Sequence, residues 1–73
     1  MDIPYTIEGV ARGHLSPMEK RPPYTWFHVF VYEKDGTYYR GQLLFHHGAW
    51  HLPDSSLEPY AEELGNLVEA WYG

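Results

Sequence analysis

Apolar and polar residues alternate along much of the first fifty positions, as in strands that bury one face. This alternation predicts a strand over residues 5–12 and stronger strands over 24–33 and 37–46, which are rich in aromatic and β-branched side chains. A short strand is predicted over residues 49–52. The chain is therefore expected to form a four-stranded antiparallel sheet that follows the sequence as a meander.

The turn between the two strongest strands decides which residues face the core. A two-residue Asp-Gly turn mixes core and solvent residues on one face, whereas a three-residue loop, residues 34–36, with Gly36 left-handed keeps them apart. We expect the second form. It places Phe27, Val29 and Val31 opposite Leu43, Gly41 and Tyr39, and a turn at His47 and Gly48 then pairs Phe45 with Trp50 and Leu43 with Leu52.

Between the first two predicted strands lie residues 13–23, which contain three prolines. Proline removes an amide donor and fixes φ, so a surface loop is expected here. After the last strand, apolar residues recur at three-four spacing, which predicts an amphipathic helix over about 57–72. Ser55 and Glu58 fit a capping box, although Pro59 at the first helical position with Glu58 as the cap competes. The apolar stripe is Leu57, Tyr60, Ala61, Leu64, Leu67, Val68 and Trp71.

These elements predict an α+β fold in which the C-terminal helix covers one face of the sheet. The covered face is expected to carry Phe27, Val29, Val31, Leu43, Phe45 and Trp50. The opposite, outer face then displays Trp26, His28, Phe30, Tyr32, Tyr38, Arg40, Gln42, Leu44, His46 and His51.

Length and composition limit this to a single domain, residues 1–73, because so short a chain builds one core. The absence of cysteine excludes disulfides, thiolate zinc sites and cysteine nucleophiles. No apolar run is long enough to span a membrane and the start lacks a signal-peptide pattern, so we expect a cytoplasmic protein that is monomeric when free.

The net charge of -5 is concentrated at one end of the chain. Residues 1–53 hold five acids and five bases, whereas residues 54–73 hold five acids and no base. A field of this sign repels phosphate and attracts basic surfaces, which favours a basic protein partner, although the acids also suit an ordinary solvated helix face. The predicted partner-binding acids are Glu58, Glu62, Glu63 and Glu69.

The outer sheet face is a second predicted partner-binding surface because it is unusually aromatic. Coverage by the proline-rich loop or by a second copy of the chain are alternatives. The rings also suit stacking of single-stranded bases. However, Arg40 alone is expected to meet a phosphate on this face, so direct nucleic-acid binding is not predicted. The residues assigned to partner binding here are Trp26, Phe30, Tyr32, Tyr38 and Arg40.

Catalytic and metal-binding patterns are weak. Ser55 and Ser56 are explained by helix capping, and no nucleophile elbow or phosphate-binding glycine loop occurs. We therefore expect neither an enzyme nor a bound cofactor or metal. His28, His46 and His51 leave a metal-binding or small-ligand module as an alternative, with His46 and His51 diagonal across the last hairpin.

Along its whole length, including residues 1–5, 24–28, 50–53 and 68–73, the chain resembles the small RNA-polymerase-binding regulators made by lytic phages. The resemblance lies in length, domain type and acidity, and it carries no functional residue across. It implies binding to the basic N-terminal region of the polymerase β′ subunit, displacement of sigma from the initiating enzyme, and antitermination with a factor such as NusA.

A competing resemblance is to HicB-like antitoxin domains, through residues 31–39 and 55–58. That fold adds a strand after the helix, whereas here only Tyr72 and Gly73 remain near the helix end. An antitoxin-like or immunity-like acidic binding protein is therefore the alternative function.

Overall fold

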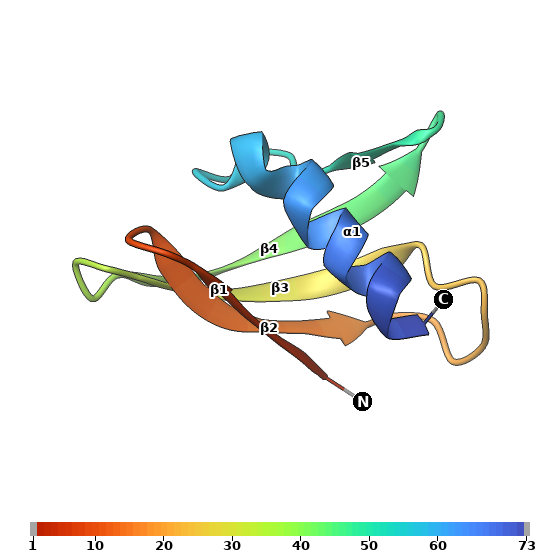
Figure 1. Ribbon diagram of the computed structural model, residues 1–73, viewed down its shortest axis with the longest axis horizontal. Helices are drawn as coiled ribbons and strands as arrows, with labels where there is room; N and C mark the ends of the chain where they lie inside the picture. The colour runs from red at the N-terminus through yellow and green to blue at the C-terminus, as the bar shows by residue number, and fades with distance from the viewer. Residues whose placement is uncertain (1, 73) are drawn as a thin grey trace.

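A computed structural model describes residues 2–72 and shows an α+β fold, an antiparallel sheet followed by a C-terminal helix (Figure 1). The sheet has five strands in sequential order instead of the predicted four. The strands are β1 (Ile3–Ile7), β2 (Ala11–Pro17), β3 (Trp26–Glu33), β4 (Tyr38–His46) and β5 (Ala49–His51).

The additional strand arises because the single strand predicted over residues 5–12 is a hairpin. Residues 8–10 form a turn closed by a 2.9 Å hydrogen bond from the Val10 amide to the Ile7 carbonyl. Gly9 occupies this turn with a φ of 76°, a left-handed conformation that glycine adopts at little cost. The chain therefore reverses where the alternation of side chains suggested that it continued.

The loop predicted over residues 13–23 is also partly wrong, since residues 13–17 belong to β2. The connection that remains, residues 18–25, is organised by the Glu19 carboxylate. It accepts hydrogen bonds from the amides of Thr25 and Trp26 at 2.7 and 2.9 Å and from the Thr25 hydroxyl at 2.8 Å. A side chain thus supplies acceptors where the prolines leave few backbone bonds.

The two later hairpins follow the predicted register. Gly36 has a φ of 93°, and the ladder sets Phe27 opposite Leu43, Val29 opposite Gly41 and Val31 opposite Tyr39. Phe45 pairs with Trp50 as expected, whereas Leu52 lies beyond the end of β5.

The helix begins differently from either predicted start. A short 3-10 turn, η1 (Glu58–Tyr60), precedes α1 (Ala61–Tyr72), and Leu57 stands before η1 with no side-chain cap. The capping box does not form because the Ser55 hydroxyl accepts the Leu57 amide at 3.0 Å, one residue before the Glu58 amide that a capping box uses.

The core lies between the sheet and α1, which contacts β1, β4 and β5 (Figure 1). Since β1 and β5 are opposite edges, the twisted sheet curls until both reach the helix. Two predicted core residues are instead exposed, Phe45 at 41% and Trp71 at 44%, and each is the second-last residue of its element, β4 or α1. The buried apolar residues are Ile3, Tyr5, Ile7, Ala11, Leu15, Phe27, Val29, Val31, Leu43, Trp50, Leu52, Leu57, Ala61, Leu64 and Val68.

Candidate functional site

The outer sheet face gathers the five residues predicted for it on two adjacent strands. Because alternate residues of β3 are buried and pair with Tyr39, Gly41 and Leu43 of β4, the intervening side chains of both strands point away from the helix. Phe30 lies opposite Arg40, and Tyr32 lies opposite Tyr38. Trp26 occupies the other end of β3 on the same face.

Three of the rings are well exposed, at 43% for Trp26, 46% for Tyr32 and 48% for Tyr38. The Trp26 indole is held by a 3.0 Å hydrogen bond from Nε1 to Oε1 of Gln42. The Tyr32 and Tyr38 rings lie against each other with centroids 4.7 Å apart. The face is therefore both apolar and ordered, which is favourable for binding without a large entropic cost.

β2, which the sequence pattern did not predict as a separate strand, brings Arg12 and His14 to this face. Arg12 lies opposite Tyr32, and His14 lies opposite Phe30. The His14 and Phe30 rings stack at 4.4 Å, and His14 Nε2 is 3.6 Å from a carboxylate oxygen of Asp2. The expectation that Arg40 is the lone base on this face is therefore wrong. Gly9 was the sequence signal for a turn that could have predicted β2, and with it the position of Arg12 and His14.

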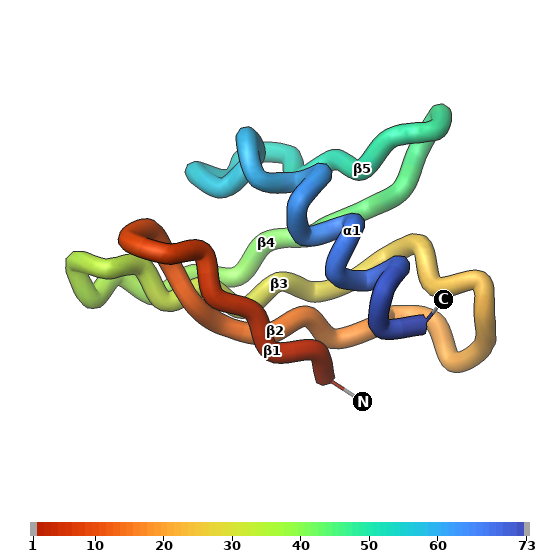
Figure 2. The backbone as a smooth tube through the Cα atoms, in the orientation of Figure 1, coloured from red at the N-terminus to blue at the C-terminus, as the bar shows by residue number. Residues whose placement is uncertain are grey.

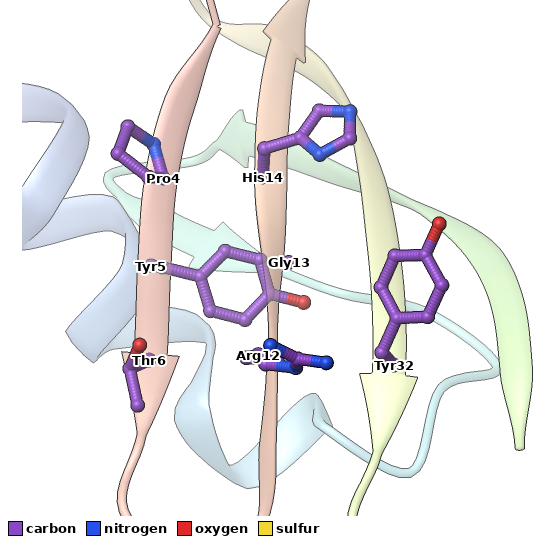
Figure 3. Close-up of a pocket in the computed structure, with 7 residues that line it drawn as sticks. All are labelled: Pro4, Tyr5, Thr6, Arg12, Gly13, His14 and Tyr32. Carbon is purple, nitrogen blue, oxygen red and sulfur yellow. The ribbon is translucent and has the colours of Figure 1, made fainter. Parts of the chain in front are cut away.

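Figure 3 shows this side of the sheet, with Arg12 extending from β2 toward Tyr32 on β3. Together with Pro4, Tyr5, Thr6, Gly13 and His14 they line a cavity of about 420 Å³. In the lining of this cavity, the Tyr5 hydroxyl donates a 2.9 Å hydrogen bond to the Phe30 carbonyl. Burial raises the pKa of Tyr5 well above its ordinary value, which keeps this hydroxyl a donor.

The proline-rich connection does not cover these rings. Its Tyr24 ring stacks on Tyr72 of α1 at 4.4 Å, and Pro22 and Pro23 line the same groove on the helix side. Figure 2 shows the segment 18–25, in orange, beside the last turn of α1. The alternative in which the loop folds over the outer face is therefore wrong.

The predicted acidic residues lie on the helix side and are all exposed, but they point in different directions. Glu62 accepts the Trp50 amide at 3.3 Å, and Glu69 accepts the Trp50 indole N–H at 2.9 Å. Glu63 instead lines a cavity beside β1, and Glu58 lies in η1. In residues 2–72 none of these carboxylates forms an ion pair.

Next to the carboxylate of Glu69, which accepts from Trp50, is a groove of about 340 Å³. It is lined mainly by apolar and aromatic side chains. Tyr24, Trp50, Val68 and Tyr72 line it together with Glu69 and the two prolines already named. The sequence pattern predicted aromatic and acidic residues on separate faces. The structure shows that the helix side combines both kinds, because β5 and the 18–25 connection meet α1 there.

Ser55 and Ser56 do not cap the helix as predicted, and instead join a hydrogen-bond network. The Tyr39 hydroxyl lies 2.9 and 2.7 Å from their hydroxyls, and Ser56 donates to Glu33 at 3.0 Å. This network ties the segment before η1 to β3 and β4, so the structure explains both serines without chemistry.

The histidines gather only in part. His46 and His51 are diagonal across the last hairpin as expected, with ring centroids 6.4 Å apart, and His51 Nε2 is 3.2 Å from the His46 carbonyl. His28 lies farther along the sheet, tilted against Phe30. Within the described residues no three histidine or carboxylate side chains converge as metal ligands.

Comparison with protein-family models, curated proteins and solved structures finds no significant match. Likewise, residues 2–72 contain no helix long and apolar enough to cross a membrane. The class of the molecule is therefore defined by the fold alone, an antiparallel sheet with a C-terminal helix and two chemically different faces.

Proposed function

We propose that this protein is a non-catalytic transcription regulator that binds bacterial RNA polymerase through its acidic helix side. The partner surface is the basic N-terminal region of the β′ subunit. Binding there inhibits initiation by displacing sigma and supports antitermination during elongation, with a factor such as NusA. The protein acts in the cytoplasm of an infected bacterial cell. The polymerase, sigma and NusA come into this proposal through the resemblance of the whole chain to small phage regulators.

One observation carries the choice of surface. The exposed carboxylates Glu58, Glu62, Glu63 and Glu69 have no ion-pair partner within residues 2–72. Unneutralised acids favour association with a basic surface, both by steering the encounter and by excluding acidic competitors.

The groove beside Trp50 adds contact area to this charge. Tyr24 and Tyr72 stack there, and Glu69 stands at its edge with one oxygen already on the Trp50 indole. An arginine or lysine side chain suits this combination, since its stem packs on aromatic rings while its charge meets a carboxylate.

The test is native-gel binding of the chain to purified bacterial core RNA polymerase, with and without sigma. We expect a specific complex that sigma opposes. The variant Glu62→Lys/Glu63→Lys should weaken it about tenfold or more, because both acids become repulsive toward a basic surface. Glu8→Lys/Asp35→Lys makes the same charge change in two exposed turns away from α1 and serves as the matched control.

Equal weakening by the control pair would show that net charge, not the helix side, governs binding. Failure to bind polymerases from several hosts would overturn the polymerase assignment. Capture of a toxin or nuclease instead would support the antitoxin-like or immunity-like alternative.

A further inference from the structure

We propose that the outer sheet face is a binding site for single-stranded nucleic acid, with bases stacking on its rings and phosphates meeting its arginines. This site lies on the face opposite the helix and is a further activity beyond the proposed polymerase contact. Nucleic-acid binding was not predicted from the sequence. It is proposed now because β2 brings Arg12 to the outer face beside Tyr32.

The strand registers place cations on both sides of an aromatic column. Across β2, β3 and β4, one row of the face reads Arg12, Tyr32 and Tyr38, and the next reads His14, Phe30 and Arg40. Side chains directly opposite each other on neighbouring strands lie close enough to contact one ligand. Each arginine therefore adjoins a ring, one from each side of β3.

Rings are available along most of the strand. Trp26 and Tyr32 are six residues apart on β3, a distance of about 20 Å at about 3.3 Å per residue. Both rings are exposed, and the indole is oriented by Gln42. A row of exposed, ordered aromatic side chains on a sheet is the arrangement with which sheets stack successive unpaired bases.

The outer face carries two arginines although the whole chain is acidic. Arg12 and Arg40 are exposed, and neither forms an ion pair within residues 2–72. Asp2 is 3.6 Å from His14, Asp54 lines a cavity together with Arg40, and Glu8 and Glu33 line another beside Arg12 and Tyr32. The helix acids lie across the sheet, so the net charge of -5 does not describe what a ligand meets here.

A polyanion with flat, apolar rings suits this face better than an acidic protein surface does. An acidic peptide supplies the charge but not the ring faces, whereas each nucleotide supplies a phosphate and a base. The proposal therefore commits to single-stranded nucleic acid, with an acidic protein as the competing outcome.

The test uses the purified chain and fluorescein-labelled uridine and deoxythymidine oligonucleotides of about ten nucleotides, within the range of known single-strand sites. Fluorescence anisotropy is measured at about 50 and 200 mM salt. We expect binding that weakens as salt rises, accompanied by a shift of the Trp26 indole N–H signal in the proton–nitrogen NMR spectrum. The Trp50 indole signal should not move, because that ring belongs to the helix side.

Variants separate stacking from charge. Trp26→Ala or Tyr32→Ala should weaken binding about five- to hundredfold, the loss typical of one stacked base. Arg12→Gln and Arg40→Gln should each weaken it and reduce the salt slope by about 0.7, as for one phosphate contact on a single strand. Arg21→Gln removes the same charge from the 18–25 connection and is the matched control.

Several results would overturn the proposal. These are no binding at the lower salt, equal losses in Arg21→Gln and Arg12→Gln, or a poly-glutamate peptide that binds equally tightly and shifts the same signals. The last would make the face a site for acidic proteins. Because no polymerase is present, failure here leaves the proposed function standing, and failure to bind polymerase leaves this proposal standing.

Discussion

At the scale of single residues, Gly13 and Tyr5 form a contact that links β1 to β3 across β2. A Cβ at Gly13 would overlap the Phe30 carbonyl, and the Tyr5 hydroxyl that bonds this same carbonyl lies 3.0 Å from the Cβ position. Gly13 therefore leaves the space in which a core tyrosine reaches across β2 to β3. Neither role follows from the sequence pattern, because a strand glycine and a buried tyrosine have many ordinary explanations.

Tyr5→Phe should lower the free energy of unfolding by about 1 kcal/mol near pH 7, the usual worth of one hydrogen bond. Burial raises the folded-state pKa of Tyr5, so the unfolded chain ionises first. The contribution of Tyr5 is thus fully present below about pH 10, the ordinary tyrosine value, and is lost as pH rises above it.

Urea titrations at neutral pH and at several values above about pH 10 measure both effects, since the difference between wild type and variant isolates this residue. The gap between the two proteins should shrink as pH rises, and then change sign. Tyr38→Phe alters an exposed ring and is the control. A difference in unfolding free energy that stays constant with pH would mean that burial does not raise the pKa of Tyr5.

At the scale of elements, the contact of α1 with β5 depends on Gly65. A Cβ there would overlap the Trp50 indole, which packs against the helix at Gly65 and donates to Glu69. Helix periodicity predicted the buried stripe of α1 correctly except for Trp71, and it missed Gly65 because glycine carries no hydrophobic signal.

Gly65→Ala should destabilise the protein by about 1 to 2 kcal/mol, because overpacking of the indole exceeds the gain of about 1 kcal/mol in helix propensity. The neighbouring Asn66→Ala, at an exposed position, should stabilise slightly. Chemical denaturation of both variants, with the Trp50 indole signal as a local reporter, gives the comparison. Stabilisation by both alanines would contradict this packing.

At the scale of the whole molecule, the two sides of the sheet differ in the charged residues that they carry. The helix side carries the exposed acids, and the outer face carries Arg12 and Arg40. Sequence position suggested an acidic C-terminal segment, but a second arginine on the outer face emerges only when β2 is placed beside β3.

Association with the polymerase should slow as salt rises, because the Debye length falls from about 10 Å at 0.1 M to about 3 Å at 1 M. Stopped-flow measurement of the association rate across this range tests the point, while dissociation should change less. An association rate that does not change with salt concentration would contradict electrostatic steering by the helix acids.

The sequence by itself determined the features that depend on local periodicity and turn chemistry. Alternation in β3 and β4, the left-handed Gly36 and three-four spacing after Leu57 were enough for the α+β class, the register of two hairpins and the helix. They also placed Trp26 and Tyr32 on one exposed face, since a strand with one buried face presents its alternate residues to the other side.

Only the tertiary structure decided how distant segments meet. The turn at Gly9 reverses a strand without interrupting its alternation, because side chains alternate equally well on either side of a tight turn. That reversal adds β2 to the sheet and with it Arg12 and His14. Likewise, Tyr24 reaches Tyr72 and Trp50 reaches Glu69 through packing between elements, contacts that no local pattern specifies.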